Sequence, residues 1–221
     1  MTGLLAALRK EMLLQWRTRA RVVAVFVFGM TCLLLFSFAI GPDTSALSRY
    51  AAGFLWLALM LSSTLSLSES FHSETAEHAL EGLLLIPVEA SALYYAKALA
   101  NAAQLTLLGF ALMPPMVVLY DAPMPRPFAL MVIIVLGSAG LAAPGTLYAG
   151  MTSQLRANQT LLPLLLFPLV VPVLLAAVKA SSLLLFGDPM QQIRSWQALL
   201  VAFNVIYWSL CGLFFERIVE D

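Results

Sequence analysis

Residues 66–97 read SLSESFHSETAEHALEGLLLIPVEASALYYAK, and this charged stretch interrupts a chain that is otherwise almost continuously apolar. It holds five of the twelve acidic residues, and the apolar segments on both sides are long enough to cross a membrane. The stretch therefore predicts a surface segment that joins two transmembrane helices. A membrane protein with an acidic segment in this place offers a docking surface to a partner.

A short amphipathic helix is expected within this stretch, over residues 73–86. Its apolar side chains recur at i, i+4, i+7 and i+8, which is one face of a helix: Ala76, Leu80, Leu83 and Leu84. The opposite face is mostly acidic: Glu74, Glu77, His78 and Glu81. Ser73 is the expected N-cap, and Pro87 restricts Ile86 and so ends the helix.

The composition places the whole chain in a membrane. Of its 221 residues 61% are hydrophobic and 11% are charged, whereas a soluble domain is about a quarter charged. Six apolar runs each approach the roughly 20 residues that cross a bilayer as a helix. Runs such as LLPLLLFPLVVPVLL (residues 161–175) lack the alternation of β-barrel strands. We therefore expect an all-α polytopic membrane protein whose residues 1–221 form a single domain.

The expected transmembrane helices cover about residues 22–40, 50–67, 98–120, 128–150, 160–178 and 198–215. Before them, residues 2–19 form an imperfect amphipathic pattern with Trp16 on the apolar side, which suits a helix at the membrane interface. A positively charged tail is the alternative. Charged and apolar residues are interspersed here, unlike the short apolar core of a cleaved signal peptide.

The distribution of Lys and Arg predicts the orientation, because cytoplasmic loops carry an excess of positive charge. With the N-terminus inside, eight basic residues fall on the cytoplasmic side: Arg9, Lys10, Arg17, Arg19, Arg21, Lys97, Arg156 and Arg217. Four fall on the other side: Arg49, Arg126, Lys179 and Arg194. Both termini and the acidic segment are therefore expected in the cytoplasm. The net charge of zero indicates no nucleic-acid partner.

No constellation of residues points to catalysis or to a metal site. His72 and His78 are the only histidines, and their spacing of six puts them on different faces of a helix, so we interpret them as solvated. Cys32 and Cys211 lie within expected spans and are interpreted as packing residues. The sequence contains neither HExxH nor a GxxxxGK[ST] phosphate loop. Without an ionisable residue in the middle of a span, energy for transport is expected to come from another chain.

Prolines interrupt two of the expected spans. Pro163, Pro168 and Pro172 lie in one span and Pro144–Gly145 in another, so they are candidates for kinks, for gating or for lining a pathway. The alternative is an ordinary structural role, since proline is frequent in transmembrane helices.

Polar and small residues inside the spans predict how the helices meet. Most of the polar side chains inside the spans are expected to form interhelical hydrogen bonds: Ser62, Ser63, Thr64, Ser66, Asn101, Gln104, Thr106 and Asn204. Close helix packing is expected around a group of small residues: Gly137, Ala139, Gly140, Ala142 and Ala143.

Several motifs occur at the spacing of a known family. One set of residues matches the spacing of this family with no gap in the alignment: Phe71, Glu74, Glu77, Leu80, Glu81, Leu83, Pro87, Ala96 and Lys97. Ile40-Gly41-Pro42, Ala143-Pro144-Gly145, Pro168 and Pro172 also fit. Over nearly its whole length the chain resembles the permease subunits of ABC-2 type transporters, and more closely the cytochrome c maturation protein B family of haem exporter membrane subunits. It departs from that family in having Glu74 and Glu77 where Asp is usual, and His78 where Gly is usual.

The resemblance implies that residues 73–86 are a coupling helix, which docks on a separate cytoplasmic ATP-binding-cassette ATPase. The residues carried over to that docking site are Phe71, Glu74, Glu77, His78, Leu80, Glu81, Leu83, Pro87 and Lys97. It also implies a second copy of the chain, a haem-handling membrane subunit and a small accessory membrane protein in a bacterial inner membrane. Haem is then the cargo of the complex in c-type cytochrome biogenesis, and no residue stands out as a haem ligand of this chain.

Several functions are compatible with these features. The first is a permease subunit that is not itself an enzyme and is driven by ATP hydrolysis on a partner. The second is a scaffold that holds a haem-handling complex together without transporting anything, and a related alternative is an ABC-2 exporter of another substrate. A membrane enzyme is disfavoured, because the sequence lacks the catalytic groups.

Overall fold

Six long helices account for nearly all the residues that the structure, a computed structural model, describes: 8–9, 19–76, 90–154 and 161–220. They are α2 (Arg19–Ile40), α3 (Thr44–Ala76), α5 (Ala90–Tyr120), α6 (Pro127–Gln154), α7 (Leu161–Phe186) and α8 (Ile193–Glu220). Each contains a segment long and apolar enough to cross a membrane. The expected all-α fold with six spans is therefore confirmed.

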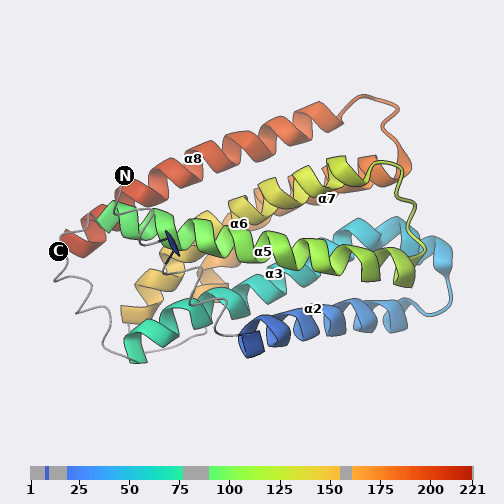
Figure 1. Cartoon of the computed structure of the whole chain (residues 1–221). Helices are drawn as coiled ribbons and strands as arrows, with labels where there is room; N and C mark the ends of the chain where they lie inside the picture. Colours follow the sequence, from blue (N-terminus) through green and yellow to red (C-terminus); the bar gives the residue numbers. More distant parts are fainter. Residues whose placement is uncertain (1–7, 10–18, 77–89, 155–160, 221) are drawn as a thin grey trace.

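The helices run alternately up and down the bundle. Figure 1 shows the connections α2–α3, α5–α6 and α7–α8 gathered at one end, on the right of the view. The last turns of α3, α6 and α8 and the first turn of α5 point toward the other end. We call this second end the coupling end, because residues 77–89 join α3 to α5 there.

Most of the helices are longer than the hydrophobic runs predicted. The span expected over residues 160–178 continues as α7 to Phe186, so that Lys179 and the segment SSLLLF (residues 181–186) are helical instead of forming a loop. The physical reason is that a helix ends where a residue breaks or caps it, and the run from Lys179 to Phe186 contains no such residue. Gly187, with a φ of 97°, ends the helix, and its amide donates to the Leu183 carbonyl at 3.0 Å.

Two aspartates cap helices at the end of the bundle opposite the coupling end. The Asp43 carboxylate accepts hydrogen bonds from the amides of Ser45 and Ala46, both at 3.1 Å, and from the Ser45 hydroxyl at 2.7 Å. Asp188 accepts from the amides of Gln192 and Ile193 at 2.8 and 2.9 Å. Each carboxylate satisfies amides that have no partner within the helix, so α3 and α8 start at defined residues.

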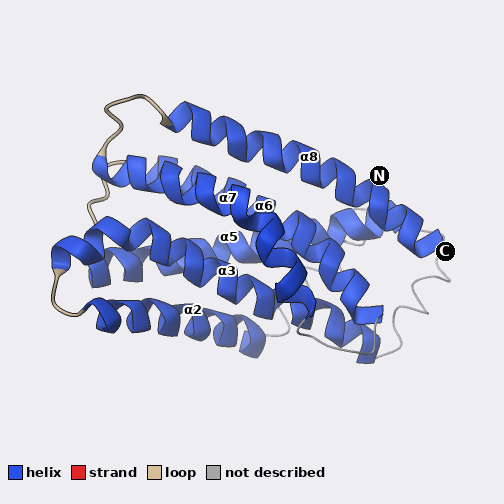
Figure 2. Ribbon diagram, turned by 180° about the vertical axis from the view of Figure 1, so that it is seen from behind, coloured by secondary structure: helices blue, strands red, loops and turns tan. Residues whose placement is uncertain are grey.

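Helix α6 is the centre of the bundle. It packs against α3, α5, α7 and α8, and 61% of the residues in its spanning segment are buried, compared with 22% in α2 and α8. The two outer helices are visible at opposite sides of the bundle in Figures 1 and 2. Any displacement of a neighbouring helix therefore reaches α6 directly.

The outer surface of the bundle is strongly apolar. Val118, Phe128 and Phe38 are 82%, 81% and 79% exposed, and similar side chains cover every helix. A soluble protein rarely exposes contiguous apolar patches of this extent, whereas lipid tails accommodate them. The chain is therefore a multi-pass membrane protein.

Candidate functional site

The structure describes three of the nine predicted docking residues, and the other six lie outside the described residues. Phe71 and Glu74 lie in the last turns of α3, which is one continuous helix from Thr44 to Ala76. Six more lie outside the described residues: Glu77, His78, Leu80, Glu81, Leu83 and Pro87. The expected interfacial helix over residues 2–19 also lies almost entirely outside them.

The start predicted for the surface helix differs from the structure. Ser73 lies inside α3, three residues before its last residue Ala76, so it is not the N-cap of a separate helix. The reason is that residues 54–76 contain no glycine or proline. A serine alone does not end a helix, because its cost inside one is small.

Lys97 is the one predicted docking residue whose side chain the structure describes. It lies in α5 and is only 3% exposed, so it faces into the bundle and does not present its ammonium group to a docking partner. One turn further along α5, Asn101 is 1% exposed and donates from Nδ2 to Thr146 Oγ1 of α6 at 3.0 Å. The predicted interhelical hydrogen bond of Asn101 is therefore confirmed, and it joins α5 to α6.

The carbonyl groups of α6 accept three further hydrogen bonds from other helices. On α8, Asn204 donates from Nδ2 to the Leu136 carbonyl at 2.9 Å, which confirms the interhelical bond predicted for this residue. Trp208, also on α8, donates from Nε1 to the Ala139 carbonyl at 3.2 Å. From α5, the Tyr94 hydroxyl donates to the Ala143 carbonyl at 3.0 Å.

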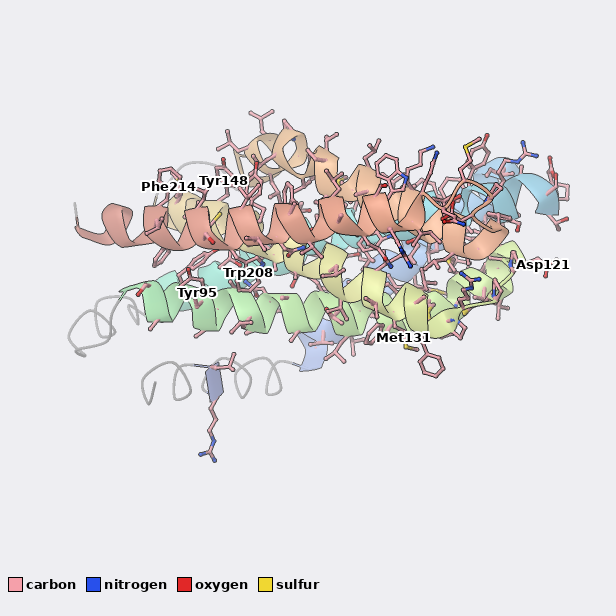
Figure 3. All side chains as sticks on the ribbon, turned by 90° about the horizontal axis from the view of Figure 1, so that it is seen from above. Tyr95, Asp121, Met131, Tyr148, Trp208 and Phe214 are labelled. Carbon is pink, nitrogen blue, oxygen red and sulfur yellow. The ribbon has the colours of Figure 1, made fainter. Side chains whose placement is uncertain are left out.

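Helices α5 and α8 also contact each other near the coupling end. The rings of Tyr95 and Trp208 are stacked, with centroids 6.4 Å apart and planes 10° from parallel. The Tyr95 hydroxyl donates to the Trp208 carbonyl at 3.3 Å. Figure 3 shows the two side chains next to each other between the helices. Gly212 makes this approach possible, because a Cβ atom there would lie 2.2 Å from the Tyr95 hydroxyl oxygen.

Among the predicted kink residues, those of α6 face the interior. Pro144 and Gly145 are both buried, and a Cβ atom on Gly145 would lie 2.4 Å from the Leu67 side chain of α3. The position is therefore enclosed by protein. It stays a candidate for a hinge inside the bundle.

The prolines of α7 differ from the prediction. Pro163 lies in the first turn, where a helix needs no amide donor, so it does not interrupt the span. Pro168 and Pro172 lie inside α7, and Figure 2 shows this helix bending part-way along its length. Both are exposed on the outer face of the bundle, so within this chain they do not line an internal pathway.

The described residues include no cluster of three or more His, Cys, Asp or Glu side chains that could hold a metal ion. Cys32 and Cys211 are free and buried in the helix packing of α2 and α8. Nothing in the described bundle resembles a catalytic constellation. Not all of the predicted interhelical hydrogen bonds form: the hydroxyls of Ser63 and Thr64 donate to the Met60 and Leu61 carbonyls of their own helix α3, at 2.7 and 2.8 Å.

A comparison with protein families decides the classification. Residues 2–216 match the model of the family described as CcmB protein. The chain belongs to the CcmB family. The match includes five of the helices completely and α8 as far as residue 216, so the membership applies to the whole bundle and agrees with the resemblance drawn from the motifs.

Individual members of the CcmB family support the same assignment. Heme exporter protein B of Haemophilus influenzae is 32% identical over 177 residues, which is 78% of each chain. Heme exporter protein B of Pseudomonas aeruginosa is 30% identical over 195 residues, or 88% of this chain and 87% of the relative. The protein of the same name from Bradyrhizobium diazoefficiens is 29% identical over 189 residues.

Sequence reasoning missed the junction that the structure builds around α6. Asn101 and Asn204 were expected to bond between helices, but Tyr94 and Trp208 were not singled out. Their only sequence signal is the presence of a hydrogen-bonding aromatic residue near a span end, which equally suits an interfacial position.

Proposed function

We propose that this chain is the membrane subunit of a haem exporter that serves c-type cytochrome biogenesis. The observation that carries the proposal is the family match over residues 2–216, together with relatives named heme exporter protein B that align over most of their length. A six-helix membrane bundle with an apolar outer surface is the architecture that such a subunit requires.

The energy for export comes from a separate ATPase subunit on the cytoplasmic side. The sequence has no phosphate loop of its own, and the acidic residues of the 66–97 stretch are suited to basic groups on a partner. Glu77 and Glu81 lie on the predicted polar face of this stretch and are therefore the residues to test. The chain itself is not an enzyme in this proposal.

The mechanism is a displacement of helices by the partner. Residues 77–89 follow α3 and precede α5, so a push on this segment when the ATPase closes acts on both helices. Both pack against α6, which transmits the displacement into the centre of the bundle. The family likeness adds a second copy of the chain, a haem-handling membrane subunit and a small accessory protein to the working complex.

The complex resides in a bacterial inner membrane with both termini in the cytoplasm. The predicted topology places eight of the twelve Lys and Arg residues on the cytoplasmic side, and this excess supports the orientation. Haem delivery, or release of a haem-loaded carrier, then occurs on the periplasmic side.

Charge reversal tests the docking surface. Glu77→Lys with Glu81→Lys should lower recovery of the ATPase with the membrane subunit, or the coupled ATPase rate, because like charges then meet across the contact. Glu220→Lys, a charge reversal at the far end of the chain, is the matched control and should change neither. Unaltered assembly and turnover in the double variant would refute this docking surface.

An inactive ATPase separates transport from scaffolding. Cells that carry the wild-type membrane subunit with an ATPase lacking its catalytic carboxylate should fail to mature c-type cytochromes, while the complex still assembles. If maturation continued at the wild-type level with the inactive ATPase, the chain would be a scaffold and the export proposal would be wrong.

A further inference from the structure

The hydrogen bonds on the α6 carbonyls follow one stripe of that helix. Leu136, Ala139 and Ala143 are spaced by three and four residues, so their carbonyls lie on the same side. The donors come from two different helices, with Asn204 and Trp208 on α8 and Tyr94 on α5. We call these three donors the α6 clamp.

The clamp surrounds the weakest point of α6. Pro144 has no amide hydrogen, so it cannot donate to the Gly140 carbonyl as other helical residues would. A helix bends most readily at such a point. Ala143 immediately precedes Pro144 and Ala139 lies one turn earlier, and donors from α5 and α8 reach them. The clamp therefore ties the part of α6 before Pro144 to two neighbouring helices, α8 and α5.

Satisfaction of buried donors explains part of this arrangement, because a polar group inside a membrane needs a partner. The need for a partner does not explain why donors from two different helices, α5 and α8, bond to carbonyls about one turn apart on α6. Trp208 in particular has two separate roles, since its indole N–H bonds to α6 while its ring and carbonyl contact Tyr95 on α5. Trp208 thus links all three helices.

The clamp also lies close to the point where force enters the bundle. Helix α5 begins at Ala90, directly after residues 77–89, and Tyr94 follows four residues later, about 6 Å along the helix axis. A displacement of the start of α5 therefore reaches the clamp within about one turn. Tyr94 is only 1% exposed, so its hydroxyl is held firmly by its surroundings.

We propose that Trp208 and Tyr94 are positioning residues that lock α6 beside Pro144 to α8 and α5, so that the three helices move as one unit when α5 is displaced. The expected effect on maturation rests on the proposed export function. The rigidity of the α5–α6–α8 unit can be tested without that function. Neither residue contacts the cargo in this proposal. They transmit motion.

Each variant removes one donor of the clamp, Tyr94→Phe with almost no change in volume and Trp208→Phe together with part of the indole ring system. Trp208→Phe removes the indole N–H and keeps an aromatic ring, and Tyr94→Phe removes only the hydroxyl. Tyr207→Phe is the matched control, because Tyr207 is adjacent to Trp208 and stacks its ring on Phe203 with centroids 4.1 Å apart, which the variant retains. All are studied in the complete complex with the ATPase in nanodiscs.

The first measurement compares ATP hydrolysis with cytochrome c maturation. Trp208→Phe and Tyr94→Phe should keep the ATPase rate within about twofold and lower maturation about five- to tenfold, the effect expected when one buried hydrogen bond is lost. Tyr207→Phe should resemble the wild type. If both activities fell in proportion to protein amount, or if neither changed, the role in transmission would be refuted.

The second measurement does not depend on export. Spin labels at Met151 on α6 and Leu213 on α8, both exposed, report the distance between these helices near the coupling end. The distance distribution should be narrow in the wild type and in Tyr207→Phe, and it should broaden in Trp208→Phe. An equally narrow distribution in Trp208→Phe would overturn the clamp. If the wild type showed no ATP-dependent maturation, the export function would fail, while this measurement would still decide the clamp.

Discussion

At the scale of single residues, Gly137 on α6 leaves almost no room for a side chain, because it packs against Trp56 on α3. The indole ring is 1% exposed and donates from Nε1 to Ser181 Oγ of α7 at 3.0 Å, so three helices share this side chain. A Cβ atom on Gly137 would lie 2.1 Å from the ring. Because the hydrogen bond and the packing hold the ring in place, the glycine cannot be replaced without moving a helix.

Gly137→Ala should therefore destabilise the protein by about 1–3 kcal/mol, the usual cost of overpacking a dense core. The measurement is the midpoint of thermal unfolding in detergent, followed by circular dichroism or by the fluorescence of a thiol-reactive dye. Gly53→Ala on α3 is the matched control, because a Cβ atom there meets no atom within 4 Å. The control should be neutral or slightly stabilising, since alanine favours a helix. Equal midpoints for Gly137→Ala and wild type would show that the contact adapts.

Asp43 provides a residue whose contribution depends on pH. The hydrogen bond from the Ser45 hydroxyl, followed by that from the Ala46 amide, holds the pKa of the Asp43 carboxyl below its usual value. A lowered pKa in the folded state means that the ionised form stabilises the fold. This contribution is complete above the ordinary pKa of an aspartate and is lost as the pH falls through that value toward the lowered one.

Asp43→Asn should remove this pH dependence. The unfolding midpoint of the wild type should decrease more than that of the variant between pH 6 and pH 3, and the two should converge at the acidic end. The effect is small, because the carboxylate is fully solvent-accessible. A parallel decrease in both proteins would show that Asp43 does not act as a charged cap.

At the scale of elements, the bend of α7 is the clearest deviation from a straight helix. Pro168 and Pro172 remove two amide donors from the same outer face, while Pro163 removes none that the helix needs. The three prolines look equivalent in the sequence. Their positions relative to the start of the helix make them different.

The double variant Pro168→Ala/Pro172→Ala should straighten α7. The distance between spin labels at Leu164 and Phe186, both exposed and near opposite ends of the helix, should increase, because a straight helix has the longer end-to-end distance. Pro163→Ala should leave the distance unchanged. A bend that persisted in the double variant would have to come from packing against α3, α6 and α8.

At the scale of the whole molecule, the alternating helices place two sets of connections at opposite ends. Single cysteines test the predicted orientation. Ser45 lies next to the α2–α3 connection, so a cysteine there should react with a membrane-impermeant maleimide added from the periplasm. A cysteine at Glu77 should be protected in intact cells and react only after permeabilisation. The reverse pattern would refute the cytoplasmic docking surface and the mechanism built on it.

The sequence predicted well those features that depend on a sum over consecutive residues, such as the hydrophobicity of a span. Hydrophobic runs predicted six spans, and α2 and α6 fall close to the residues expected, since the transfer of each side chain into lipid contributes separately. Helix ends were less predictable. Lys179 was expected at the start of a loop, because the expected span ended at residue 178. It lies in α7 instead, because the helix continues until Gly187 and a long side chain can reach beyond the apolar core.

The class of the protein could be read from its amino acids: an all-helical membrane protein with six spans, a family likeness carried by the motifs around residues 71–97, and no catalytic motif of its own. The contacts between helices became known from the structure alone. It buried Lys97, turned Pro168 and Pro172 outward, and brought Tyr94 and Trp208 to the carbonyls of α6. The membrane class and the spans follow from residues along one helix, through their composition and the spacing of apolar side chains. The contacts between helices depend on how each helix is rotated relative to its neighbours, which residues along a single helix do not specify.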